Sequence, residues 1–440
     1  MTPRTKTEIQ VLSRAAAWIL IALYLLGFAI SAASRSQSDF IIYRNAGIEA
    51  AHAGQIYNFQ DPSPFQYAPI YAVAFIPLGF TPPRPAQLLW FLVSMVLALP
   101  AMILGTSRLL FGRGFQLRWE LIVIPMLLCI RFIHPNFDHG QINLLLLAMI
   151  VWGLALADQS SPVAGGALLA ASLLAKPFGV PVILYLFGRR RVRFIASLLF
   201  FAVALLWLPS VFVGAGYALH ETAEYIRSLT TRVPNLSHDL FNKYNQSAAA
   251  IAVRLFATTR RRAGLLSQSA AATLGFAFQC ALTIAVIVWI GLRRSSMTEQ
   301  NARLSLAALF CAVAAFSPVS WLEYYMVLEV PYMALAFISC ASGEAERGRA
   351  RVAQFVLAGS LVVNLGTRLF EAGLYYGAAY FGSLIVLVTI LALTGIEQPL
   401  PARGRLPAWP DRHRAASVRN VLERLCARRA WVSRWCRSRR

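Results

Sequence analysis

Residues 15–33, AAAWILIALYLLGFAISAA, form an uncharged apolar run, and residues 34–44, SRSQSDFIIYR, follow it directly. A helix of about 20 apolar residues spans the hydrocarbon core of a bilayer. Basic residues precede the run at Arg4, Lys6 and Arg14, so we expect its first end in the cytoplasm. We therefore predict a retained signal anchor rather than a cleaved signal peptide, with residues 34–44 on the outer face.

The composition of the chain is that of a polytopic membrane protein. Of its 440 residues, 58% are hydrophobic and only 14% are charged, whereas soluble domains are about half apolar and a quarter charged. The formal net charge is +22, but the basic residues lie in short loops and in the tail. This distribution follows the positive-inside rule, so we expect membrane lipids rather than nucleic acid as partners. The six cysteines form no CxxC pair, which disfavours both a disulfide framework and a zinc site.

Apolar runs and arginine clusters together predict an all-α bundle of about twelve transmembrane helices with both termini in the cytoplasm. The predicted spans lie near 15–33, 86–107, 119–133, 142–157, 163–188, 194–213, 268–291, 303–316, 323–340, 352–368 and 374–394. The run 163–188 is expected to be a hairpin that Lys176-Pro177 breaks at its outer tip, because proline lacks the amide hydrogen that a helix needs.

Two apolar runs, 66–80 and 248–257, are expected to be juxtamembrane helices at the outer interface. Counting either as a span would move arginine clusters to the outer face. We expect one transmembrane domain over residues 1–395 and a basic cytoplasmic tail over 396–440, disordered or attached to the membrane surface. The outer loops of the domain are predicted at residues 34–85, 134–141, 214–266 and 317–322.

Nearly every unusual polar residue falls on the predicted outer face. Asp39 follows the first span, where a carboxylate is a candidate for deprotonating a sugar hydroxyl. The structural alternative for Asp39 is an acidic N-cap of the helix that follows. Lys176 stands among apolar residues, where an ammonium group is costly unless it snorkels or meets an anion such as a phosphate.

Other polar residues on this face are candidates for binding a substrate: Tyr43, Arg44, Gln66, Gln141, Asn143, Asn245, Gln246 and Glu323. Tyr43 and Arg44 would otherwise belong to a solvated helix face. Asn245-Gln246-Ser247 reads either as a glycosylation sequon or as a polar cluster that opens an apolar helix. These alternatives stay open from the sequence alone.

His134, Asp138 and His139 combine residue types that bind metals. Their H-x3-D-H spacing matches no strong zinc signature. We therefore predict no metal site and no cofactor, with a divalent cation kept open as an alternative.

Several of these motifs occur in the same order in a known family: Ser38-Asp39-Phe40-x-x-Tyr43, Phe65-Gln66-Tyr67-Ala68-Pro69-Ile70, Gly140-Gln141-Ile142-Asn143, Lys176-Pro177, Asn245-Gln246-Ser247 and Ser317-Pro318-x-Ser320-Trp321. Over about residues 15–395 the chain resembles glycosyltransferase family 87, of the GT-C class. That class includes polyprenyl-phosphate-mannose-dependent mannosyltransferases and related arabinofuranosyltransferases of bacterial envelopes. The resemblance implies many transmembrane helices, with outer juxtamembrane helices over a cavity.

The resemblance also implies a reaction. A sugar, mannose or similar, would pass with inversion from a polyprenyl-phosphate donor to an envelope lipid or glycan acceptor, on the outer face of the bacterial inner membrane. The family's catalytic aspartate matches Asp39, which would take the acceptor proton, while Lys176 would stabilise the departing polyprenyl phosphate. One departure is Glu323, which stands two residues after Trp321 where the family commonly has histidine.

Three other functions compete with this hypothesis. A transporter for a polar solute would show inverted repeats and polar breaks near the bilayer midplane, whereas the polar residues here gather at one interface. A lipid-carrier ligase or polymerase of envelope polysaccharide also has many spans and a large outer loop. A non-catalytic envelope-assembly protein would not depend on Asp39.

Overall fold

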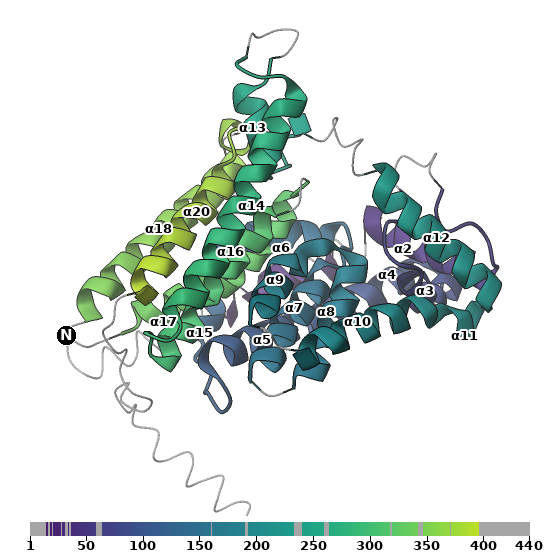
Figure 1. The fold of residues 1–440 in the computed structure, drawn as a ribbon, viewed down its shortest axis with the longest axis horizontal. Helices are drawn as coiled ribbons and strands as arrows, with labels where there is room; N and C mark the ends of the chain where they lie inside the picture. The colour runs from purple at the N-terminus through teal and green to yellow at the C-terminus, as the bar shows by residue number, and fades with distance from the viewer. Residues whose placement is uncertain are drawn as a thin grey trace, which may run out of the picture.

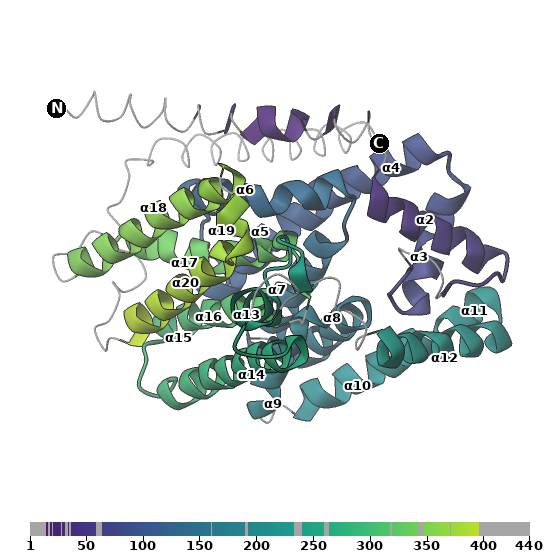
Figure 2. The same cartoon turned by 90° about the horizontal axis from the view of Figure 1, so that it is seen from above.

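The computed structural model describes a helical protein. It covers residues 15, 18–19, 21–27, 29–30, 34, 37–58, 64–159, 161–189, 192–232, 240–258, 264–316, 319–341, 346–369 and 371–395, and the predicted tail lies outside these residues. Within them every regular element is a helix, and β pairing is limited to two isolated bridges (Figures 1 and 2). The predicted all-α class is confirmed for this part of the chain.

The helices follow one another with short connections. In chain order they are α2 Ser38–Ala51, α3 Pro69–Phe80, α4 Pro83–Leu92, η1 Val93–Ala98, α5 Leu99–Phe111, α6 Glu120–Asp138, α7 Asn143–Gln159, α8 Pro162–Ala175, η2 Pro177–Gly179, α9 Val180–Gly188, α10 Val192–Trp207, α11 Pro209–Val213, α12 Ala215–Arg232, α13 Ala248–Phe256, α14 Gln268–Arg293, α15 Glu299–Ser305, α16 Ala307–Ala315, η4 Leu322–Leu328, α17 Glu329–Ser339, α18 Arg347–Leu369, α19 Glu371–Tyr375 and α20 Ala378–Gly395. The segment η1 is π-helical, and η2 and η4 are 3-10 helices.

Six helices among the described residues are long and apolar enough to cross a membrane. They are Pro83–Phe111, Glu120–Asp138, Val192–Val213, Gln268–Arg293, Arg347–Thr367 and Ala378–Gly395. Each coincides with a predicted span, which makes the chain a multi-pass membrane protein. The count of about twelve stays a prediction, because the other apolar helices are shorter.

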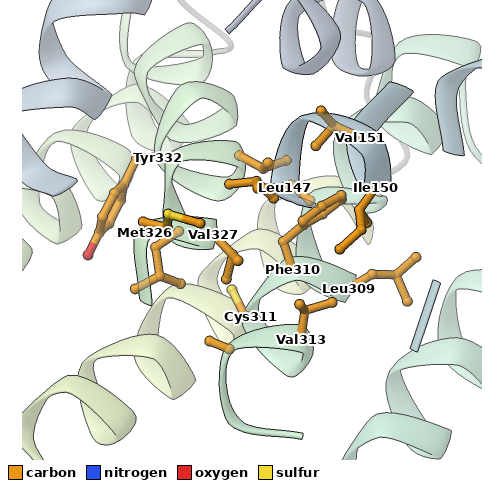
Figure 3. Packing of buried hydrophobic residues seen from close by; sticks show 14 of the residues in the cluster. Leu147, Ile150, Val151, Leu309, Phe310, Cys311, Val313, Met326, Val327 and Tyr332 are labelled. Atoms are coloured by element: carbon orange, nitrogen blue, oxygen red, sulfur yellow. The ribbon is translucent and has the colours of Figure 1, made fainter. Parts of the chain in front are cut away.

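Helix α7 and the short helices α16 and α17 form the centre of the bundle. Figure 3 shows Leu147 and Ile150 of α7 beside Phe310 of α16, with Met326 and Tyr332 nearby. The residues predicted as spans near 303–316 and 323–340 are therefore short helices buried inside protein. Peripheral helices instead expose large apolar side chains, such as Phe200 on α10 and Phe355 on α18. An apolar surface of this kind is stable when it faces lipid.

Two regions predicted as outer loops are largely helical. Helix α6 continues to Asp138, because Ile133 and Phe137 are both buried and keep its apolar face on the core. The region 214–266 contains α12 and α13. Helix α13 has nine residues, too few to span, and it packs against α14 with most of its residues buried, while its predicted place at the outer interface stays a prediction.

A second cluster of aromatic and aliphatic residues forms around α2 and α3. Figures 1 and 2 both show α2, α3, α4, α11 and α12 gathered at one end of the molecule. Tyr43 of α2 packs on Phe75 of α3, with ring centroids 5.2 Å apart, and Trp90 of α4 lies beside both. This packing holds the beginning of α2 in place.

Candidate active site

A cavity of about 950 Å³ opens where α2, α6, the break after α8 and η4 meet. Its size is that of a pocket for a small molecule or a lipid head group. Six of the ten predicted site residues line it: Asp39, Tyr43, Gln66, Gln141, Lys176 and Glu323. These residues come from five separate segments of the chain, so the fold brings the predicted site together.

The beginning of α2 is fixed to the end of α6. The backbone amides of Asp39 and Phe40 donate to the carbonyl of His139, at 3.0 and 3.2 Å. Gly140 makes this junction possible, because its φ of +67° and its close approach to Phe40 both exclude a side chain. The N-cap position is Gln37, so Asp39 stands inside the first turn, where the helix dipole favours a carboxylate.

Both carboxylate oxygens of Asp39 accept a hydrogen bond. The Ser38 hydroxyl donates to Oδ1 at 3.1 Å, and Nε2 of Gln141 donates to Oδ2. Nδ1 of His139 lies 3.1 Å from the Ser38 hydroxyl oxygen. Asp39 is half-buried at the pocket wall, so its carboxylate is held in place and still accessible to a substrate.

Lys176 occupies the predicted break between α8 and η2, where its backbone is extended. Its Nζ donates to Oδ1 of Asn143 at 2.8 Å, to Oε1 of Gln141 at 3.2 Å and to the Tyr324 hydroxyl at 3.4 Å. The Tyr324 ring centroid lies 4.8 Å from Nζ. Burial lowers the pKa of Lys176 to about 8, although Glu323 and Asp39 oppose the shift. The ammonium is therefore held in the pocket wall by contacts with three neighbouring side chains.

Glu323 enters the pocket at the start of η4. Its Oε1 lies 3.5 Å from Nε2 of Gln141, so one amide group contacts the carboxylates of both Glu323 and Asp39. Burial raises the pKa of the Glu323 carboxyl, while Lys176 and His139 lower it. Glu323, which stands where the resembled family commonly has histidine, therefore belongs to the same site as Asp39.

Tyr43, Gln66 and Asn143 differ in their access to the pocket. The Tyr43 hydroxyl lies 2.8 Å from that of Tyr67, and burial raises the pKa of Tyr43. Gln66 is exposed at the pocket edge. Asn143 is fully buried behind the wall and donates to Oε1 of Gln141 at 3.0 Å.

Three predicted site residues lie away from the pocket. Arg44 donates to the carbonyls of Gly79 and Thr81, at 2.9 and 3.1 Å, and so satisfies the end of α3. Asn245 and Gln246 are fully buried in contacts with other parts of the chain. The sequence did not indicate that Asn245 and Gln246 are buried, because their contacts with Ser320 and Leu374 join segments that are distant in the chain.

The Asn245-Gln246-Ser247 motif joins the start of α13 to the segment before η4, and Asn245 forms an isolated β-bridge with Trp321. Oδ1 of Asn245 accepts the amide hydrogens of Ser320 and Ser247, at 3.0 and 3.1 Å. The Ser247 hydroxyl caps α13 by accepting from the amide of Ala250 at 3.1 Å. Of the two sequence interpretations, the geometry fits the polar cluster that opens a helix, because a glycan could not reach Asn245.

Four pocket residues on or just after α6 were not predicted as substrate contacts: Arg131, His134, Asp138 and His139. The first three repeat at intervals of three and four residues, which is the signal of one helix face. The last three were considered only as metal ligands. Within the described residues, no group of three or more His, Cys, Asp or Glu side chains is arranged to hold a metal ion.

Comparison with known proteins identifies relatives of the chain. The model of glycosyltransferase family 87 matches residues 65–318. A polyprenol-phosphate-mannose-dependent alpha-(1-2)-phosphatidylinositol pentamannoside mannosyltransferase of Mycobacterium tuberculosis (strain CDC 1551 / Oshkosh) is 26% identical over 312 residues, covering 67% of this chain and 65% of the relative.

A second relative is a polyprenol-phosphate-mannose-dependent alpha-(1-2)-phosphatidylinositol mannoside mannosyltransferase of Mycolicibacterium smegmatis (strain ATCC 700084 / mc(2)155). It is 24% identical over 280 residues, covering 60% of this chain and 59% of the relative. The chain therefore spans less than two thirds of the length of either relative. No solved structure matches the chain significantly.

Proposed function

Because the chain belongs to glycosyltransferase family 87, we propose that it is an integral membrane glycosyltransferase that uses a polyprenyl-phosphate sugar as donor. The names of both relatives specify polyprenol-phosphate-mannose and phosphatidylinositol mannosides. We infer mannose as the sugar and a lipid-anchored polyol or glycan as the acceptor. The observation that carries the proposal is the Asp39 carboxylate, held by Ser38 and Gln141 at the wall of a 950 Å³ pocket.

In the proposed reaction an acceptor hydroxyl attacks the anomeric carbon of the donor. Asp39 takes the hydroxyl proton as the new glycosidic C–O bond forms, and the bond between the anomeric carbon and the phosphate oxygen breaks. The polyprenyl phosphate leaves with the electron pair of that bond, so the anomeric configuration inverts. Arg131, a basic side chain in the pocket wall, offsets the charge of the leaving phosphate.

We propose that the pocket faces the outer side of the bacterial inner membrane and that both termini are cytoplasmic. Helix α7 supports this orientation, since it begins at the pocket with Asn143 and ends 16 residues later at Gln159, about 24 Å away. At that far end Arg294 pairs with Asp158 at 2.9 Å, and Gln159 contacts the carbonyl of Arg108. Arginines near span ends mark the cytoplasmic side.

The test is a transfer assay with the full chain in lipid nanodiscs. Polyprenyl-phosphate-mannose and a phosphatidylinositol mannoside are supplied, and released polyprenyl phosphate is measured. Asp39→Asn should lower the rate by about 10²–10⁴-fold, the usual contribution of a general base. Glu371→Gln is the matched control, because Glu371 is 81% exposed in a surface pair with Lys243 and should leave the rate unchanged.

Other outcomes would overturn the proposal. Absence of turnover with every polyprenyl-monophosphate sugar would exclude this donor class. Accumulation of a polar solute by proteoliposomes, without release of polyprenyl phosphate, would favour the transporter. An Asp39→Asn variant with the wild-type rate would remove Asp39 as the base.

A further inference from the structure

The ammonium group of Lys176 has no hydrogen left for a phosphate. It carries three N–H donors, and three acceptors lie within reach, at 2.8, 3.2 and 3.4 Å. All three acceptors are neutral oxygens, and two of them belong to the amides of Gln141 and Asn143. A phosphate oxygen would have to displace one of these contacts.

The amide of Gln141 has only one favourable orientation in this setting. Its Oε1 accepts from Lys176 at 3.2 Å and from Asn143 at 3.0 Å, while its Nε2 donates to Asp39 and to Glu323. The flipped amide would place NH2 against an ammonium and oxygen against two carboxylates. The positive charge of Lys176 therefore fixes Oε1 of Gln141 on its own side, and so directs Nε2 of Gln141 toward Asp39.

A second route connects the same ammonium to Glu323. Oδ1 of Asn143 accepts from Lys176, so Nδ2 of Asn143 is turned toward Oδ1 of Asn136, at 2.9 Å. Nδ2 of Asn136 then lies 3.3 Å from the backbone carbonyl of Glu323. Asn136 and Asn143 are both buried, at 1% and 0% exposure, so this network is shielded from water.

We propose that Lys176 is a positioning residue, which orients Gln141 so that its amide holds the Asp39 carboxylate in the reactive geometry, and that it is not a ligand of the donor phosphate. This inference rests on the proposed function, in which Asp39 is the base. A hydrogen bond from an amide whose oxygen contacts a cation is strengthened by polarisation, and it favours the ionised carboxylate. Loss of Lys176 or Gln141 should therefore act on the state of Asp39 rather than on donor affinity.

Three measurements on full-length Lys176→Met and Gln141→Leu test this assignment. They are kcat, the pH profile of kcat/KM, and the inhibition constant of polyprenyl phosphate as a product inhibitor. Each variant should lose about 10²-fold in kcat, the loss that accompanies a catalytic group displaced by about 1 Å. The acidic limb of the profile should move to higher pH in both, and the inhibition constant should stay at the wild-type value.

Other titratable groups line the same pocket as Asp39, so the variants are compared with wild type over the same pH range. These groups are Tyr24, Tyr43, Tyr67, Arg131, His134, Asp138, His139, Tyr244, Glu323 and Tyr324. These groups are present in all the proteins compared. A shift of the acidic limb on removal of Lys176 or Gln141 is therefore caused by loss of the hydrogen bonds that link Lys176, Gln141 and Asp39. The double variant should lose no more than the worse single variant, because both changes interrupt one path.

A phosphate-binding Lys176 gives the opposite pattern. Lys176→Met would then weaken inhibition by polyprenyl phosphate by an order of magnitude while Gln141→Leu would not, and the acidic limb would stay in place. Losses that multiply in the double variant would also overturn the proposal. If Lys176→Met does not fold, Gln141→Leu alone decides, since an unshifted limb refutes the role of the amide. Absence of transfer by the wild type would instead refute the proposed function itself.

Discussion

Replacing Gly47 with alanine should reduce transfer strongly, although Gly47 lies outside the pocket. At this residue α2 crosses α3 so closely that an added Cβ would lie 2.5 Å from the carbonyl oxygen of Phe75 and 2.9 Å from the amide nitrogen of Ile76. Both neighbours are backbone atoms of a helix, so no side chain can turn away. Ordinary contact begins near 3.4 Å, so α2 must move from α3 by about 0.9 Å.

That displacement reaches the site through α2 itself. Asp39 precedes Gly47 by eight residues on the same helix, and Tyr43, one turn from Gly47, packs on Phe75. Misplacing a catalytic group by about 1 Å costs about 10²-fold in rate, which corresponds to about 2.7 kcal/mol of activation free energy. Overpacking of this kind also costs about 1–3 kcal/mol in stability.

The assay is release of polyprenyl phosphate at saturating donor, with the melting temperature of each purified variant recorded in the same nanodiscs. Gly359→Ala is the matched control, because Gly359 lies inside α18 and an added Cβ there meets no atom within 4 Å. The control should keep its rate and gain slightly in stability, since alanine favours helix by about 1 kcal/mol over glycine. Equal rates for Gly47→Ala and the control would refute the view that the α2–α3 contact positions Asp39.

Two further predictions concern groups outside the pocket. Asn245→Ala should lower the melting temperature, because it removes the oxygen that accepts from the buried amides of Ser320 and Ser247. Each lost acceptor costs about 1–3 kcal/mol of stability. A melting temperature equal to that of wild type would contradict this. Burial raises the pKa of Glu221 in the folded protein above its ordinary value of 4.5. As pH rises, Glu221 therefore loses its proton in the unfolded state before it does so in the folded state. The stability of the fold should fall as pH rises from 4.5 through the pKa of the folded state. Glu221→Gln should flatten that part of the curve of melting temperature against pH, and an unchanged curve would show that Glu221 does not contribute to it.

The sequence alone determined the class of the protein and several local features. Continuous apolar runs of spanning length predicted helices, because a helix satisfies all its backbone hydrogen bonds within one segment in the bilayer. The break at Lys176-Pro177 followed from proline chemistry, and the structure has it at that place. A helix start at Ser247 was one of the two interpretations that the sequence left open, since capping depends on residues only three positions apart, and the structure has the cap there.

The partners of polar side chains were decided only by the tertiary structure. Asp39 and Gln141 are about 100 residues apart, and Lys176 meets Tyr324 across 148 positions. Arg44 follows Asp39 within a turn and a half, yet it turns away to the end of α3. Periodicity reports which face of a helix is apolar, but it carries no information about which other segment packs there. The same physical fact explains why Asp39, Lys176 and Gln141 could each be predicted as candidates, while the hydrogen bonds that join Lys176 to Gln141 and Gln141 to Asp39 could be found only in the folded chain.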